Sequence, residues 1–146
     1  MKNLLFIICF ILISCNFSTI AQTPQVSDLG KMNFNEVLNS FDVEPCEKQK
    51  EVITYCYEGG NKMSYLFENN ILHGIISWTA FTSKYLAERE LEKKVSEFES
   101  KNDIIGFKQN GKILFSLPNS LIVFSFGVAE YNNTAYLGEY VFLKPK

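Results

Sequence analysis

The feature of this chain that most limits its fold is a series of short turn signals that cut it into strand-length segments. Asn69-Asn70, Asn110-Gly111 and Asn132-Asn133 pair residues that tolerate the positive φ of a two-residue hairpin turn. Connections this short join antiparallel neighbours, because a parallel crossover needs about a dozen residues or more. We therefore expect an antiparallel sheet.

The segments beside these turns have the composition of strands, with β-branched and aromatic residues in alternation. They are residues 51–58, 63–68, 71–78, 104–109, 112–117, 120–131 and 135–144. In the hairpin that turns at Asn69-Asn70, simple alternation places Met63 and Tyr65 on the same face as Trp78. The same register places His73 on the more polar face of its strand.

Two segments have helical spacing instead. Residues 33–41 form a short apolar pattern that Asn33 or Asn35 can cap. Residues 82–101 form the one long helix, which Thr82 or Ser83 can cap. Its apolar stripe is only one face wide, so we expect it to pack on a sheet while its charged residues face solvent. The stripe consists of Ala87, Leu91, Val95 and Phe98.

These elements predict an α+β fold. We expect an antiparallel sheet of about six to seven strands, with the long helix across one face and the short helix at the amino terminus. A chain of 146 residues has room for one domain, expected at residues 33–146 after a flexible segment at 22–32. The formal net charge of −2 gives no basic excess for nucleic acid.

The amino terminus has the pattern of an export leader, with Lys2 followed by ten apolar residues at 4–13. Two cleavage sites fit. Leu12-Ile13-Ser14-Cys15 resembles the lipobox of bacterial lipoprotein precursors, which would end the signal at residue 14 and attach lipid, and so a membrane, to Cys15. Cleavage after Ala21 would instead remove residues 1–21 and release the protein. We expect an exported protein, either a membrane-anchored lipoprotein or a periplasmic or secreted one.

Cys46 and Cys56 remain as an even pair once the leader is set aside. In an oxidising compartment such a pair predicts a disulfide, and two free thiols are the alternative. The spacing is too long for a redox C-x-x-C motif, and no second pair completes a zinc site. We expect no metal and no cofactor.

The run "NFNEVLNSF" followed by "MSYLFENNILHGI" is similar to the helix-then-strand pattern of small exported domains of the beta-lactamase-inhibitor-protein type. Bacterial outer-membrane assembly lipoproteins show the same pattern. The resemblance covers residues 33–75 and implies an exported α+β domain. It departs where the long helix divides the strands, so no binding residue is carried over.

Catalytic groups are scarce. His73 is the single histidine, and no nucleophile elbow, Walker or dinucleotide pattern is present. Glu130 and Glu139 could face one another across two strands, although solvated strand ends are the simpler explanation. We therefore expect no catalytic residues and a protein that is not an enzyme.

Aromatic residues are the remaining unusual feature. Tyrosine and tryptophan suit surfaces where one end of the ring is apolar and the other is wet. They can form a binding face, or they can stabilise the sheet as cross-strand pairs. The residues singled out for a binding face are Tyr55, Tyr57, Trp78, Tyr136 and Tyr140.

The sequence thus indicates a small exported cell-envelope protein of non-enzymatic character that binds another protein or a surface component. A small secreted hydrolase or an enzyme inhibitor is the alternative, and a purely structural lipoprotein is a third. The sequence names no ligand.

Overall fold

A computed structural model describes residues 23–144 of the chain. Both cleavage sites and the lipidation site at Cys15 lie outside the described residues, and the leader hypothesis stays a prediction. The described elements, in chain order, are η1 (Val26–Asp28), α2 (Phe34–Asn39), β1 (Glu47–Gln49), β2 (Val52–Cys56), η2 (Glu58–Gly60), β3 (Lys62–Glu68), β4 (Ile71–Phe81), α3 (Lys84–Asn102), β5 (Phe107–Gln109), β6 (Lys112–Ser116), β7 (Ile122–Tyr131) and β8 (Thr134–Leu143).

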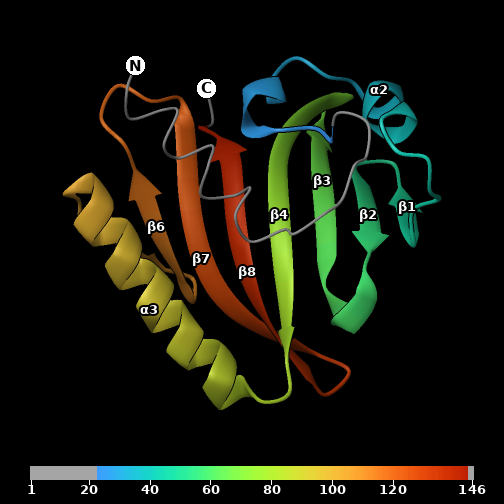
Figure 1. The fold of residues 1–146 in the computed structure, drawn as a ribbon. Helices are drawn as coiled ribbons and strands as arrows, with labels where there is room; N and C mark the ends of the chain where they lie inside the picture. Colours follow the sequence, from blue (N-terminus) through green and yellow to red (C-terminus); the bar gives the residue numbers. More distant parts are fainter. Residues whose placement is uncertain (1–22, 145–146) are drawn as a thin grey trace.

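The strands form one antiparallel sheet in the order β1-β2-β3-β4-β8-β7-β6-β5, which confirms the expected α+β class (Figure 1). Each half is an α-helix followed by four consecutive strands, and the halves join where β4 pairs with β8. The sheet has eight strands where about six to seven were expected. The expected segments omit β1, because Glu47–Gln49 is polar and exposed throughout and has no hydrophobic alternation.

Both α-helices begin at side-chain caps, as their sequences predict. The Asn33 carboxamide oxygen accepts hydrogen bonds from the backbone N–H groups of Asn35 and Glu36, and the Glu36 carboxylate accepts one from the Asn33 N–H. The Ser83 hydroxyl oxygen accepts from the Leu86 N–H at the start of α3. These caps satisfy backbone donors that have no partner inside a helix.

The two α-helices pack on the same face of the sheet, which we call the covered face. Val37 of α2 and Phe98 of α3 belong to one core cluster with residues of the strands. Figure 1 shows α3 beside β6 and β7 and α2 at the other end of the sheet. Phe98 anchors α3, because its ring lies 4.7, 5.3 and 5.5 Å from the rings of Phe115, Phe124 and Phe126.

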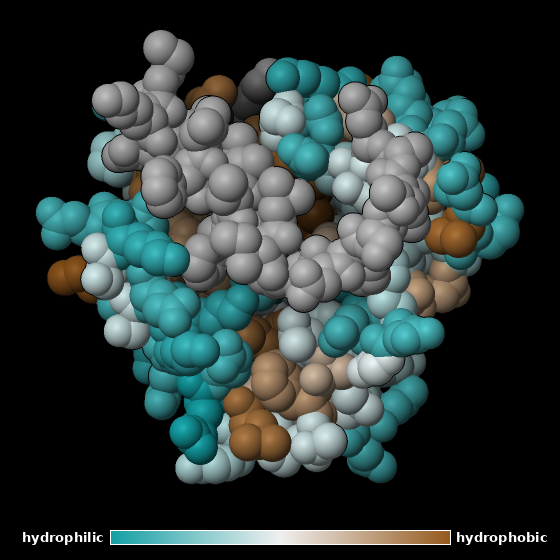
Figure 2. Space-filling model, viewed as in Figure 1, coloured by the Kyte–Doolittle hydropathy of each residue, from teal (hydrophilic) through white to brown (hydrophobic). Residues whose placement is uncertain are grey.

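The outward side of α3 is hydrophilic, as Figure 2 shows for the surface over this helix. Glu88, Arg89, Glu92 and Lys93 are exposed there, as expected, whereas Lys94 is only 15% exposed and pairs with Glu139 of β8. No helix among residues 23–144 combines the length and the apolar character that crossing a bilayer would require.

The register of the β3–β4 hairpin differs from the expected one. The turn lies at Asn69-Asn70 as predicted, with both residues at positive φ, but a β-bulge falls between Leu66 and Phe67. Beyond the bulge Met63 pairs with Ser77. The extra residue shifts the alternation by one, which turns Trp78 to the face opposite Met63. The prediction that Trp78 shares a face with Met63 and Tyr65 is therefore wrong.

Part of the segment expected to be flexible packs against the domain. Leu29 is buried in the core cluster. The Gly30 N–H donates to the Leu72 carbonyl, and the Leu72 N–H donates to the Met32 carbonyl. These bonds attach residues 29–32 to the start of β4.

Candidate binding face

The second face of the sheet, which we call the open face, carries no α-helix of the described structure. Successive residues of a strand point to opposite faces and directly paired residues share a face. The strand pairings therefore place Lys62 beside Trp78, Trp78 beside Gly138, Gly138 beside Gly127 and Gly127 beside Lys112. One row of side chains crosses five strands, over about 19 Å at a strand spacing of about 4.8 Å.

Two glycines in this row let its neighbours lean inward over the sheet. A Cβ atom at Gly138 would lie 2.7 Å from the Tyr140 ring and 2.9 Å from the Trp78 ring. A Cβ at Gly127 would lie 3.0 Å from Cγ of Lys112. The absence of side chains at these positions is thus what lets the rings and the lysine stem lie across the strands.

The aromatic rings gather at the centre of the open face. The Trp78 ring lies 5.3 Å from the Tyr140 ring and 6.4 Å from the Tyr136 ring, at interplanar angles of 75° and 85°. Edge-to-face packing of this kind suits the ring quadrupoles. We call Lys62, Trp78, Tyr136, Tyr140 and Lys112 the lysine–aromatic cluster.

The two lysines lie at opposite ends of this cluster. The Lys112 Nζ lies 3.8 Å from the centre of the Tyr140 ring, and the Lys62 Nζ lies 5.0 Å from the Tyr136 ring. Both are cation–π contacts. Neither ammonium has a carboxylate partner among the described residues, so the cluster presents two positive charges without counter-charges.

Burial shifts the titration of two members of the cluster. Desolvation lowers the pKa of the Lys112 ammonium and raises the pKa of the Tyr140 phenol, because burial disfavours the charged form of each group. The Tyr140 side chain is buried and that of Lys112 is partly buried, so the centre of the open face is only partly exposed to water.

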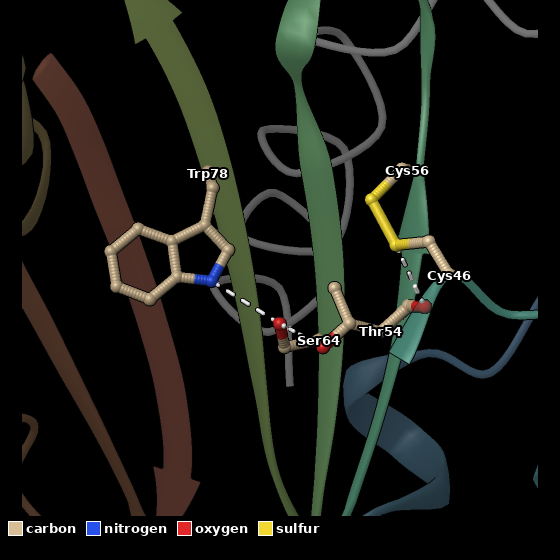
Figure 3. Close-up of a disulfide and its surroundings, with 5 residues drawn as sticks. All are labelled: Cys46, Thr54, Cys56, Ser64 and Trp78. Carbon is tan, nitrogen blue, oxygen red and sulfur yellow. Dashed lines mark hydrogen bonds between the residues drawn. A yellow bond between two sulfur atoms is a disulfide. The ribbon is translucent and has the colours of Figure 1, made fainter. Parts of the chain in front are cut away.

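A short chain of polar contacts connects Trp78 to the edge of the sheet (Figure 3). The Trp78 indole N–H donates to the Ser64 hydroxyl at 3.3 Å, and the Ser64 and Thr54 hydroxyls lie 3.0 Å apart. Cys46 Sγ lies 3.3 Å from the Thr54 carbonyl oxygen. A disulfide sulfur has no hydrogen to donate, so this last approach is a contact only.

The predicted disulfide between Cys46 and Cys56 is confirmed, with a Cα–Cα distance of 5.8 Å. Cys56 pairs with Lys62, so the disulfide lies at the end of the row that carries the cluster. It holds the chain before β1 to the end of β2 and so limits movement of this edge.

Beside the cluster, a second row on the open face is apolar. The strand pairings place Val52, Leu66, Gly74, Phe142 and Val123 in line. Val123 is buried and the other three side chains are partly buried, although none of the four belongs to the core cluster of the covered face. The open face thus combines an aromatic, cationic centre with an apolar flank.

The structure divides the five aromatic residues singled out from the sequence. Trp78, Tyr136 and Tyr140 come together on the open face. Tyr55 is 1% exposed and stacks on Phe41 in the core of the covered face, where Tyr57 also packs. The five residues therefore do not form one surface.

Sequence reasoning did not single out Lys62 or Lys112. Each lysine begins a strand directly after a turn, where a charged residue is ordinary. Only the pairing of β4 with β8 brings these two distant residues onto one row. No local pattern in the sequence signals that pairing.

The titratable residues considered for catalysis lie apart from the cluster. The His73 Nδ1 lies 3.3 Å from the Glu68 carboxylate at the β3–β4 hairpin. Glu130 pairs with Lys84 and Glu139 with Lys94, both lysines of α3. No group of His, Cys, Asp and Glu side chains within residues 23–144 is arranged to hold a metal ion.

The fold and this face define an α+β domain with one helix-covered face and one open face that is aromatic and cationic. No family model, curated protein or solved structure matches the chain.

Proposed function

We propose that this protein is a small exported protein of the cell envelope that binds a partner, without catalysis, through the open face of its sheet. The single observation that supports binding through this face is the lysine–aromatic cluster. Tryptophan and tyrosine at the centre of a surface, with charged groups around them, are typical of binding hot spots.

Export is supported by the leader pattern and by the disulfide, which is compatible with an oxidising compartment. The intact mass of the mature protein recovered from cells tests this part. A chain that begins at an acylated Cys15 or at Gln22 supports it. A stable product that retains Met1 contradicts it.

The hydrolase alternative receives no support from the described geometry. His73 contacts Glu68, and each of Glu130 and Glu139 contacts a lysine. A nucleophile oriented by a base is the arrangement such chemistry requires, and none of these contacts supplies it.

Site-specific photocrosslinking in cells tests the binding proposal. A photoreactive residue at Tyr136 on the open face is compared with one at Tyr85, which is exposed on α3. We expect a discrete adduct from Tyr136 that disappears when Trp78 is replaced by Ala. Equal adducts from both positions, or none from Tyr136, would contradict the use of this face.

A further inference from the structure

We infer that the partner of the open face is a protein surface that presents apolar side chains between two carboxylates. This inference deepens the proposed function and rests on it. Its basis is the chemistry of the lysine–aromatic cluster and of the apolar row beside it.

Charge complementarity identifies the acidic character of the partner. The Lys62 and Lys112 ammonium groups stand at opposite ends of the cluster and have no carboxylate partner among the described residues. Their positions in the sheet are about 19 Å apart. Two carboxylates placed on either side of an apolar centre would match this distribution and would exclude surfaces of the wrong charge.

The same charges argue against a second copy of this chain as the occupant. At the centre of the open face, the rows of paired residues that run from β3 to β6 include two lysines and no acidic residue. Two such centres packed face to face would bring like charges together. A different, acidic molecule is the better match.

The hydrogen-bonding groups at the centre argue against a sugar polymer. The Trp78 indole N–H is already bonded to Ser64, and the Ser64 hydroxyl is buried against Thr54. Polyhydroxylated ligands depend on convergent polar groups, and these three groups are used internally. The apolar row of Val52, Leu66, Phe142 and Val123 also has no partner in such a ligand.

The ring geometry argues against a stacking platform or a membrane contact at this site. The Trp78 ring stands at 75° and 85° to its two tyrosine neighbours, so no coplanar set of ring faces is available for stacked bases. Tyr140 is only 9% exposed, and a ring held this close to the sheet does not project into a lipid interface. A protein surface that supplies its own apolar side chains remains the best match.

The test uses the whole mature protein and a display library of random peptides as the probe. Trp78 is the only tryptophan of the chain, so its fluorescence reports binding of the selected peptides directly. We expect the selected peptides to share two acidic residues that flank apolar ones. Peptides without acidic residues would overturn the inference.

Charge-reversal variants make the test specific. The double variant Lys62→Glu/Lys112→Glu is expected to weaken binding at least about tenfold. The matched control is Lys48→Glu/Lys108→Glu, which changes the net charge equally. Its exposed lysines pair with Ile53 and Ile113 and so point to the other face. We expect the control to change binding by less than about twofold, and equal losses in both variants would contradict the inference.

Two further probes separate the competing partners. Polygalacturonate represents an acidic polysaccharide, and phosphatidylglycerol vesicles represent an anionic membrane. If either shifts Trp78 emission with the same dependence on Lys62 and Lys112 while peptides do not, the inference fails but the proposed function stands. If no probe binds, the inference also fails, and the crosslinking experiment decides the proposed function separately.

Discussion

The two faces of this sheet bury aromatic rings by different means. On the covered face, phenylalanines pack around Phe98 of α3 in a helix-sealed core. On the open face, Trp78 and two tyrosines pack against one another above Gly138. A lysine side chain, not a helix, lies against the Tyr140 ring. We therefore expect substitutions in the covered face to cost more stability than substitutions in the lysine–aromatic cluster of the open face.

The largest expected effect tests the covered face. Phe98→Ala removes a buried ring that three other rings contact, so we expect a loss of about 3–5 kcal/mol in the free energy of unfolding. Urea denaturation followed by circular dichroism measures it. Tyr136→Ala on the open face is the comparison, with less than half of that loss expected. A similar loss from both variants would remove the distinction between the faces.

The next effect concerns the disulfide at the edge of the open face. Cys46→Ser/Cys56→Ser releases a short loop and is expected to destabilise the fold by about 3 kcal/mol in the chain-entropy model. Hydrogen exchange should increase first in β1 and β2, while β6–β8 stay protected. The variant should no longer respond to reductant. A uniform rise in exchange across the whole sheet would show that the disulfide supports both faces.

The smallest effect concerns an unpaired polar group buried in the covered face. The buried Tyr55 hydroxyl has no hydrogen-bond partner in the described structure. Desolvation, with smaller contributions from Tyr57 and Glu44, raises the pKa of Tyr55 to about 12. Because the folded state keeps the proton more tightly, the stability contributed by the neutral phenol is complete below about pH 10 and declines as the pH rises toward 12.

Tyr55→Phe should therefore be neutral at pH 7 or stabilising by up to about 1 kcal/mol, because it removes an unpaired buried polar group. It should also lose less stability than the parent protein between pH 10 and 12. Urea midpoints across that pH range measure both effects. A clear loss of stability at neutral pH would show that the hydroxyl has a partner.

Much of the fold follows from local signals in the sequence. The caps at Asn33 and Ser83 begin the two helices where expected, and the asparagine-containing turns fall at the predicted positions. Each signal depends on a few neighbouring residues and on their backbone preferences. The disulfide was also predictable, because Cys46 and Cys56 are the only two cysteines outside the predicted leader.

The faces were harder to predict because they depend on register. The bulge between Leu66 and Phe67 is marked in the sequence only by Gly74, which pairs with Leu66, yet it decides which face receives Trp78. Alternation alone places Tyr136 and Tyr140 on the same face of β8, because they are four residues apart. It does not bring Lys62 and Lys112 to them, since that requires the order of strands from distant parts of the chain.

The position of β8 has a consequence for how the protein folds. This strand is the last in chain order, yet it lies between β4 and β7 in the middle of the sheet. Two meanders, β1–β4 and β5–β8, can each form from short-range hairpins, but they remain unjoined until β4 pairs with β8. Such distant pairing slows folding, and before the two edges pair each meander has an unpaired inner edge that is vulnerable to association with other chains.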